Sequence, residues 1–269
     1  MIETKLRPAE AVRRAALVTH GKPDVIGDAL ARVRRCAEVA GVELFEGPCP
    51  DPDIIVALGG DGTMLRALRG ALTVEAPVFG VNFGRVGFLT SISGDQLEEG
   101  LRRVFAGDYR MIELCTLAVT VNGERELAVN DVVVTSSQPG RMVELEWEIG
   151  GEDLGRQPCD GMICSSPTGS TAYNLSNGGP VMMWGLEAMA ITFVAPHSLD
   201  ARPFVVPRGL DLRLTNQTLD VPVAVLADGQ TVGELSFSAT AEIGLARETS
   251  LLALLPEVTF FSRYHDVFV

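Results

Sequence analysis

The first hundred residues alternate short apolar runs with amphipathic segments. Apolar runs at 15–19, 53–58 and 77–81 have the length and continuous hydrophobicity of buried strands. Polar and apolar positions between and after these runs recur with helical spacing. Strands that alternate with helices build parallel sheets covered on both faces, so residues 1–107 predict a doubly wound α/β domain.

The helical segments have recognisable limits. Residues 26–37 carry apolar positions three or four apart, which predicts a helix that Asp24 caps and Gly41 ends. Residues 64–68 suit a helix directly after the second strand. Residues 96–105 predict a further helix near the end of this domain.

The pattern changes near residue 108, and strands dominate from there on. Runs 117–121 and 126–134 flank Asn122-Gly123, a dipeptide typical of a type I′ hairpin turn. Residues 143–149 alternate apolar and acidic side chains, as in a half-buried strand. Further apolar runs predict strands at 210–214, 221–227 and 231–237. We therefore predict two packed antiparallel sheets over 108–249, with a tail from about 250 to 269 that packs back on the first domain.

Charge narrows the range of partners. The chain has 269 residues, a formal net charge of -13 and a pI of about 4.7. Nucleic-acid binding needs clustered Lys and Arg, so we expect no nucleic-acid partner. A nucleotide remains possible as a ligand, because backbone N–H groups and a metal ion can hold phosphates without net positive charge.

Cysteine usage and hydropathy indicate the compartment. The five cysteines are odd in number and show no Cys-x-x-Cys spacing, which favours reduced thiols over disulfides or a zinc site. No apolar run approaches the roughly 20 residues of a membrane span, and no secretory signal follows Met1. We expect a cytoplasmic protein without a membrane partner.

The strongest chemical signal is Gly59-Gly60-Asp61-Gly62-Thr63, between a predicted buried strand and a predicted helix. Ligands of open α/β sheets bind at the carboxyl ends of strands, and glycines let backbone N–H groups approach phosphate oxygens. An acidic residue in such a turn suits a metal ligand or a proton acceptor. The alternative is a tight turn in which the carboxylate only caps the helix. The usual P-loop and dinucleotide glycine fingerprints are absent.

Two further motifs lie in the second half. Residues 160–176 run from Asp160-Gly161 through a loop of small hydroxyl residues to Tyr173, whose ring could stack on a base. Asn130-Asp131 interrupts an apolar strand, and a carboxylate there suits the two hydroxyls of a ribose. The alternatives are a helix-capping turn for the first motif and a water-facing edge or bulge for the second.

Taken together, these motifs resemble the NAD kinase family, including its ATP- or polyphosphate-dependent bacterial members. The resemblance rests on Gly-Gly-Asp-Gly-Thr at 59–63, the Asn-acidic pair at 130–131, and the long block from Asp160-Gly161 to Pro180. Segments 196–203 and 228–230 are also similar. The resemblance implies an N-terminal Rossmann-like α/β domain, a C-terminal β-sandwich, and a homodimer or homotetramer.

The resemblance also implies the reaction and its residues. ATP or polyphosphate would phosphorylate NAD to NADP, with a divalent ion such as Mg²⁺. Asp61 would be the catalytic carboxylate beside the adenosine 2′-hydroxyl, and glycine-turn residues would bind phosphate. Asn130, Asp131 and Asp160 would hold the nicotinamide side. The remaining expected contacts are Gly59, Gly60, Gly62 and Thr63 for phosphate, Thr171, Ala172, Tyr173 and Ser176 around the adenosine, and Ala195 and Gln230 for NAD in a less defined role.

One departure and three rival functions accompany this prediction. The family's pair is usually Asn-Glu, and Asp131 is one methylene shorter. A lipid kinase of the diacylglycerol type would share the glycine turn and leave the 160–180 block unexplained. A non-catalytic NAD(P) sensor would retain the binding residues without turnover. A serine hydrolase would use His197, Ser198 and Asp200, yet no Gly-x-Ser-x-Gly elbow occurs.

Overall fold

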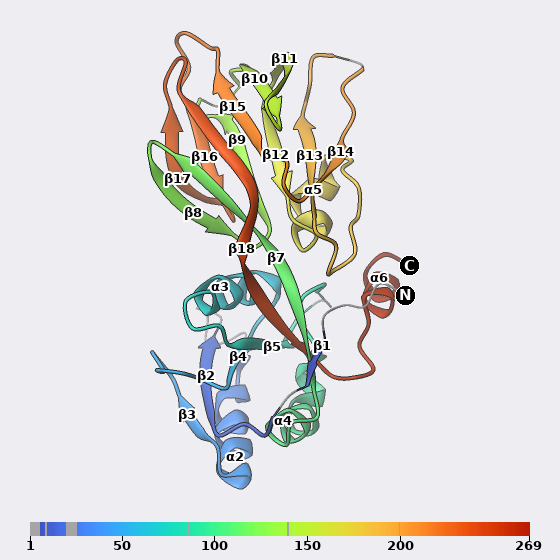
Figure 1. Cartoon of the computed structure of the whole chain (residues 1–269). Helices are drawn as coiled ribbons and strands as arrows, with labels where there is room; N and C mark the ends of the chain where they lie inside the picture. Colours follow the sequence, from blue (N-terminus) through green and yellow to red (C-terminus); the bar gives the residue numbers. More distant parts are fainter. Residues whose placement is uncertain (1–5, 9, 20–25, 85–86, 139, 199) are drawn as a thin grey trace. The chain divides into compact units, whose positions relative to one another are not determined.

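The computed structural model describes residues 6–8, 10–19, 26–84, 87–138, 140–198 and 200–269. It divides into two compact units, residues 1–114 with 249–269, and residues 115–248 (Figure 1). The change of unit falls inside two long strands, β7 (Arg110–Val121) and β18 (Thr240–Leu254). The predicted Asp24 cap lies outside the described residues.

The first unit is built on a parallel sheet. β3, β2, β4 and β5 lie side by side in that order, and residues Leu251–Ala253 of β18 run parallel to β5. β6 is also parallel to β5, and β1 is antiparallel to β7. The strands are β1 (Leu6–Pro8), β2 (Arg14–Thr19), β3 (Glu43–Phe45), β4 (Ile54–Leu58), β5 (Pro77–Asn82) and β6 (Ile92–Ser93).

Helices cover both faces of this sheet, as the alternating pattern predicts. Ile54, Val56 and Leu58 pack with the buried sides of α2 and α4 in one cluster. Adjacent strand residues point to opposite faces, and Gly80 faces the Met64 side chain of α3. The helices are α2 (Ala29–Ala40), α3 (Asp61–Ala71), the 3₁₀ turn η1 (Gly94–Gln96), α4 (Leu97–Phe105) and α6 (Phe260–Phe268). The predicted doubly wound architecture is confirmed.

Helix limits follow local chemistry. α2 ends at Gly41, as predicted, with a φ of 69° that suits glycine. α6 begins after Thr259, whose hydroxyl accepts the Ser262 backbone N–H while the Ser262 hydroxyl accepts the Thr259 N–H. This capping box fixes the start of the helix. Residues 249–269 belong to the first compact unit.

The second unit is a β-sandwich. One sheet has the order β14, β13, β12, β9, β16, β17, and the facing layer contains β11, β10, β15 and part of β18, with β7 paired to β8. Apolar side chains from both layers form one buried cluster. The elements are β8 (Glu124–Ala128), β9 (Asp131–Ser136), β10 (Val143–Ile149), β11 (Glu152–Cys159), β12 (Gly161–Ser165), η2 (Gly169–Thr171), α5 (Tyr173–Ser176), β13 (Ala188–Val194), β14 (Phe204–Pro207), β15 (Leu212–Asn216), β16 (Val223–Ala227) and β17 (Gln230–Leu235).

The hairpin prediction is right in its turn and wrong in its second strand. Asn122 and Gly123 join β7 to β8 with φ values of 53° and 82°, as a type I′ turn requires. The predicted strand 126–134 is instead two strands in different layers, because the chain bends at Val129 and Asn130. No helix of the described residues is long and apolar enough to span a bilayer.

Candidate functional site

The glycine turn joins β4 to α3 as predicted. Gly59 has a φ of 153°, and its N–H donates to the Val81 carbonyl at 2.9 Å. The carbonyl of Gly60 accepts the N–H groups of Thr63 and Met64, so α3 begins at Asp61. The N–H groups of a first helical turn lack intrahelical partners and point outward, which suits an anion.

The Asp61 carboxylate is fixed at both oxygens. Oδ2 accepts the Phe88 backbone N–H at 2.8 Å, and Oδ1 accepts the Leu89 N–H at 3.1 Å. Gly87 lies so close that a Cβ there would be 2.1 Å from Oδ1. The sequence predicted the carboxylate but gave no sign of the two amides that hold it, because backbone donors carry no sequence signature.

A cavity of about 400 Å³ adjoins this turn in the first unit. Asn82, Phe83 and Gly84 line it at the carboxyl end of β5, together with Arg32 of α2. The Asn82 Oδ1 atom accepts the Gly84 N–H at 3.0 Å and lies 4.0 Å from the Cβ position of Gly60. The cavity and the glycine turn therefore share one edge of the sheet, where ligands of such sheets bind.

In the second unit, Asn130 and Asp131 lie at a strand's start rather than its centre, which corrects the sequence prediction. The physical cause is Asp228, whose carboxylate accepts the N–H groups of Val129 and Asn130 at 2.9 and 2.7 Å and that of Asp131 at 3.4 Å. These donors are turned away from a strand partner, so the chain bends before β9. The Asp228 N–H in return donates to the Asp131 carbonyl at 3.0 Å.

Asp131 is buried beside a second carboxylate. Its exposed fraction is 7%. Burial, and to a smaller extent the nearby charge of Asp228, raise its pKa from the ordinary 3.8 to about 7. A carboxyl group with a pKa near 7 can accept or donate a hydrogen bond at neutral pH.

Most hydroxyls of the 165–171 loop serve the loop itself. Ser166 Oγ donates to the Val129 carbonyl at 2.6 Å, and Ser170 Oγ donates to the Pro167 carbonyl at 2.7 Å. Asn174 is fully buried and bonds the Ser170 and Pro180 carbonyls. The hydroxyls of Ser166 and Ser170 are therefore already bonded to carbonyls of the chain.

Two buried oxygens lack hydrogen-bond partners among the described residues. They are Asn130 Oδ1 and Thr168 Oγ1. They belong to neighbouring segments, because the Ser166 N–H donates to the Asn130 carbonyl and a Cβ on Gly169 would meet that carbonyl at 2.1 Å. Buried polar atoms are rarely left unpaired, so this pair marks a place for a ligand's polar groups.

The other predicted contacts fall into two places. Thr171, Ala172, Tyr173 and Ser176 follow Gly169 directly in η2 and α5, and Gln230 starts β17 just after Asp228. Asp160 and Ala195 lie at the opposite end of β12, where the Asp160 N–H donates to the Val194 carbonyl. Asp160 and Ser165 are five strand positions apart, about 17 Å. The unit does not bring Asp160 and Ala195 together with Asn130.

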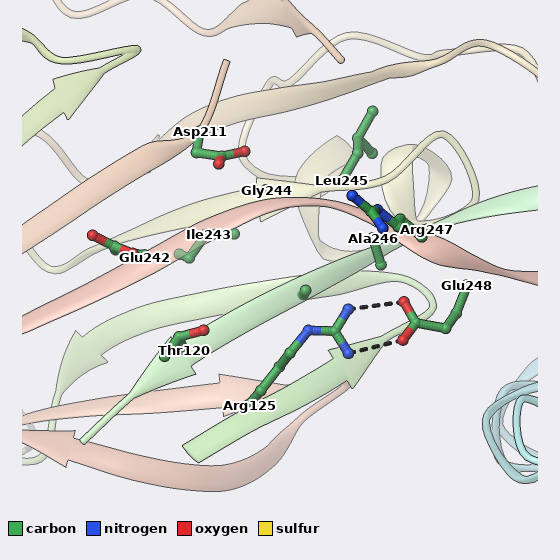
Figure 2. A pocket seen from close by; sticks show the side chains of 11 residues that line it. Thr120, Arg125, Asp211, Glu242, Ile243, Gly244, Leu245, Ala246, Arg247 and Glu248 are labelled. Atoms are coloured by element: carbon green, nitrogen blue, oxygen red, sulfur yellow. Dashed lines mark hydrogen bonds and ion pairs between the residues drawn. The ribbon is translucent and has the colours of Figure 1, made fainter. Parts of the chain in front are cut away.

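A different cavity, of about 470 Å³, lies between β7, β8 and residues 242–248 of β18 (Figure 2). Figure 2 shows Arg125 and Glu248 facing each other, and their two hydrogen bonds measure 2.9 and 2.8 Å. The predicted site residues are not among its lining. Its principal cation is already neutralised, so we assign it no role in the chemistry.

The sequence analysis missed two contributors. Asp228 was noted only as part of a similar segment, although its position before Gly229, in a turn after a buried strand, indicated a constrained loop. Thr168 gave no signal, because its burial depends on how the loop packs against the Asn130 backbone.

Fold and site together define a two-unit nucleotide-binding protein with a fixed carboxylate at the end of a parallel strand. Residues 49–109 match the model of the ATP-NAD kinase N-terminal domain, and residues 129–253 match that of the ATP-NAD kinase C-terminal domain. The chain is 37% identical over 271 residues to the NAD kinase of Heliobacterium modesticaldum, covering 96% of this chain and 93% of the relative. It is 40% identical over 223 residues to that of Gemmatimonas aurantiaca, covering 78% and 75%.

Solved structures agree with these sequence matches. An NAD kinase from Archaeoglobus fulgidus in complex with ATP superposes with a TM-score of 0.78 at 27% identity, over 94% of this chain and 99% of that one. Yeast NADH kinase complexed with NADH shares the fold, with a TM-score of 0.84 at 20% identity over 95% and 87% of the two chains. The chain belongs to the NAD kinase family.

Proposed function

We propose that this protein transfers the terminal phosphoryl group of ATP to the adenosine 2′-hydroxyl of NAD and so makes NADP. The observation that carries the proposal is the Asp61 carboxylate, held by two backbone N–H groups at the end of β4 in a chain of this family. Polyphosphate is a second donor to test, because the glycine turn would bind any terminal phosphate.

Asp61 acts on the hydroxyl of the acceptor. Phosphoryl transfer passes through a loose transition state, so positioning and charge neutralisation supply most of the rate. A carboxylate is too weak a base to deprotonate a ribose hydroxyl fully before attack. Asp61 therefore orients the 2′-hydroxyl and takes its proton late, as the new O–P bond draws negative charge from that oxygen.

The donor phosphates lie against the glycine turn. Gly59, Gly60, Gly62 and Thr63 form the proposed phosphate contact. The N–H groups of Gly60 and Gly62 are the proposed donors, because those of Gly59 and Thr63 already donate to the carbonyls of Val81 and Gly60. The start of α3 adds the positive end of its dipole. The adjoining cavity of about 400 Å³ has room for part of the donor nucleotide.

NAD binds through the second unit. Asn130 and Asp131 hold the nicotinamide side, and Thr171, Ala172, Tyr173 and Ser176 surround the adenosine, with Gln230 nearby. The unpartnered Asn130 Oδ1 supports this assignment, since it can accept a hydrogen bond from an amide or a hydroxyl. The Tyr173 side chain is 46% exposed and so accessible for stacking.

Asp160 and Ala195 are proposed NAD contacts that need a second copy of the chain. They lie about 17 Å along β12 from the Asn130 end. A homodimer or homotetramer supplies them from a neighbouring molecule, and we propose such an assembly. We further propose that domain boundaries fall at 107 and 249, and that the protein works in the cytoplasm, where its free cysteines stay reduced.

A divalent ion fits the donor set as part of its complex with ATP. The described residues contain no cluster of three or more His, Cys, Asp or Glu side chains that could hold a metal by themselves. Mg²⁺ commonly binds through one or two carboxylates, water and substrate phosphates. Held mainly by those phosphates, the ion would neutralise phosphate charge that this acidic chain cannot, and Asp61 would remain available to the acceptor hydroxyl.

Product analysis tests the proposal. The purified protein is incubated with Mg-ATP and NAD, and separately with NADH or a diacylglycerol, and the products are separated by chromatography. We expect NADP from NAD. Binding of NAD without NADP formation would instead support the sensor, and a phosphorylated lipid would support the lipid kinase.

A further inference from the structure

We propose that the C-terminal helix α6 positions the catalytic carboxylate, acting through the loop at 87–91 that holds Asp61. The inference deepens the proposed function and rests on Asp61 being the catalytic group. Helix and loop both belong to the first unit, although α6 begins at Phe260, far from Asp61 in the sequence (Figure 1).

The loop is the direct support of Asp61. Phe88 and Leu89 donate the two backbone hydrogen bonds to its carboxylate. Gly87 packs against the same carboxylate with no room for a Cβ. A shift of this loop would therefore move or release the carboxylate, and misplacement by about 1 Å can cost a catalytic step roughly 10²-fold.

Aromatic rings of α6 pack against the side chain of Phe88. The ring centroids of Phe88 and Phe260 are 5.2 Å apart, edge to face. Those of Phe88 and Phe268 are 6.0 Å apart, with the planes tilted by 37°. Aromatic pairs at such spacings attract beyond the area they bury. The side chain of Phe88 is thus held by both ends of α6, while its backbone N–H holds Asp61.

Arg263 supplies a polar contact between the same two elements. Only 7% of Arg263 is exposed, and its guanidinium donates to the Ser91 carbonyl. Burial lowers its pKa, while the charges of Asp266 and Asp61 favour the charged form. The Arg263 Nε atom is buried without a hydrogen-bond partner among the described residues.

Ser91 anchors the far end of the loop. Its N–H donates to the Gly80 carbonyl of β5 at 2.8 Å, and its hydroxyl donates to the Ala253 carbonyl of β18 at 2.8 Å. Together with the Arg263 contact, these bonds tie one residue to two core strands and α6. The loop is fixed at Ser91 and at Phe88, on either side of Leu89.

α6 is itself fixed to the core of the first unit. Arg110 of β7 donates to the Val258 carbonyl, and Arg103 of α4 forms a 2.6 Å ion pair with Glu257. Val258 packs against the buried apolar cluster under the sheet. A helix this short is marginal alone, so its position depends on these tertiary contacts. The core of the first unit thus contacts α6, α6 contacts the loop at 87–91, and the loop holds Asp61.

Substitutions on the two faces of α6 separate a positioning role from general packing. Phe260→Ala and Arg263→Gln remove the contacts to the loop. Phe261→Ala removes the same ring from a position that is 66% exposed and whose ring lies 6.0 Å from that of Phe260, so it serves as the matched control for loss of an α6 ring. Arg263→Lys keeps the charge and one donor. All variants are made in the full chain, and thermal unfolding establishes that each is folded.

We expect Phe260→Ala and Arg263→Gln to lower kcat about tenfold or more, with the KM values for NAD and ATP changed less than about twofold. Arg263→Lys should recover part of the loss, and Phe261→Ala should keep the wild-type kcat. Amide hydrogen exchange of Phe88 and Leu89 should accelerate in the two loop-contact variants only. Should Arg263→Gln fail to fold, the kcat and the amide exchange of Phe260→Ala and Arg263→Lys are compared with those of the wild type and Phe261→Ala instead.

The same substitutions in an Asp61→Asn background identify the route of the effect. If α6 acts through Asp61, they change the residual kcat less than about twofold there. Equal losses in both backgrounds would overturn the inference, as would unchanged kcat and exchange in folded single variants. A higher KM for ATP at constant kcat would instead make Arg263 a direct phosphate ligand. A wild-type protein that makes no NADP overturns the proposed function, and the exchange rates still report whether α6 holds the loop.

Discussion

Both units use hydrogen bonds between a carboxylate and backbone N–H groups, but the proposed site residue is on the acceptor side in the first unit and on the donor side in the second. In the first unit, the Asp61 side chain is the acceptor and the backbone of Phe88 and Leu89 supplies the donors. In the second, the backbone from Val129 to Asp131 supplies the donors and the Asp228 side chain accepts them. One arrangement immobilises a carboxylate, and the other immobilises a strand start.

This difference fits the two proposed tasks. A catalytic carboxylate must lie within a fraction of an ångström of its target, so fixing both oxygens is useful. A recognition segment must instead leave side-chain atoms available, and Asn130 Oδ1 is buried without a partner. Substitutions in the first unit should therefore act mainly on kcat, whereas those in the second should act mainly on the KM for NAD.

The largest expected effect among the supporting residues is that of Gly87→Ala. The added Cβ would lie 2.1 Å from Asp61 Oδ1, so the carboxylate or the loop must move. We expect kcat to fall about 10²-fold with little change in the KM for NAD. Gly70→Ala in α3, where a Cβ meets nothing within 4 Å, is the control, and steady-state kinetics compares the two. A fully active, folded Gly87→Ala enzyme would show that Asp61 needs no such fixing.

A smaller effect, on the KM for NAD rather than on kcat, is expected for Asp228→Asn. The neutral amide accepts the Val129 and Asn130 N–H groups less strongly than the carboxylate does, so the strand start loosens. We predict a rise of about tenfold in the KM for NAD, about 1.4 kcal/mol of binding, with kcat within about threefold. The exposed Asp220→Asn is the charge-matched control. A loss confined to kcat would contradict the assignment of NAD recognition to the second unit.

The third prediction concerns the stability of the fold and its dependence on pH rather than activity. The pKa of Asp131 is raised to about 7 by burial and by Asp228, so the folded protein keeps a proton that the unfolded chain releases near pH 4. Stability should fall as the pH rises from about 4 to 7, by at most about 1.4 kcal/mol per pH unit from this group. Asp131→Asn should flatten that decline in urea unfolding at several pH values. An identical pH dependence in wild type and variant would show that Asp131 ionises normally.

Sequence patterns predicted the fold well because burial periodicity is local. The strand at 54–58, the helix ending at Gly41 and the Asn122-Gly123 turn each follow from a few neighbouring residues. The strand break at Asn130 could not be predicted in this way. It depends on Asp228, which is distant in sequence and comes close only after β9 and β16 pair.

The candidate site likewise could be predicted only where its signal lies in neighbouring residues. The glycine turn identified Asp61, because glycines around a single acidic residue at a strand end are a local signal. The sequence could not show which hydroxyls of the 165–171 loop are bonded within the chain. Those of Ser166 and Ser170 donate to carbonyls, whereas Thr168 Oγ1 has no partner among the described residues. The support from α6 depends on tertiary contacts between residues far apart in sequence, such as Phe88 and Phe260.

The most direct test of the account is the single-turnover rate of Asp61→Asn with saturating NAD and Mg-ATP. Asparagine keeps the size of the side chain and one acceptor oxygen but cannot take the hydroxyl proton. We predict that NADP formation falls about 10²- to 10⁴-fold while the protein stays folded and its Kd for NAD changes little. A folded Asp61→Asn protein that forms NADP at close to the wild-type rate would contradict the role assigned to this carboxylate.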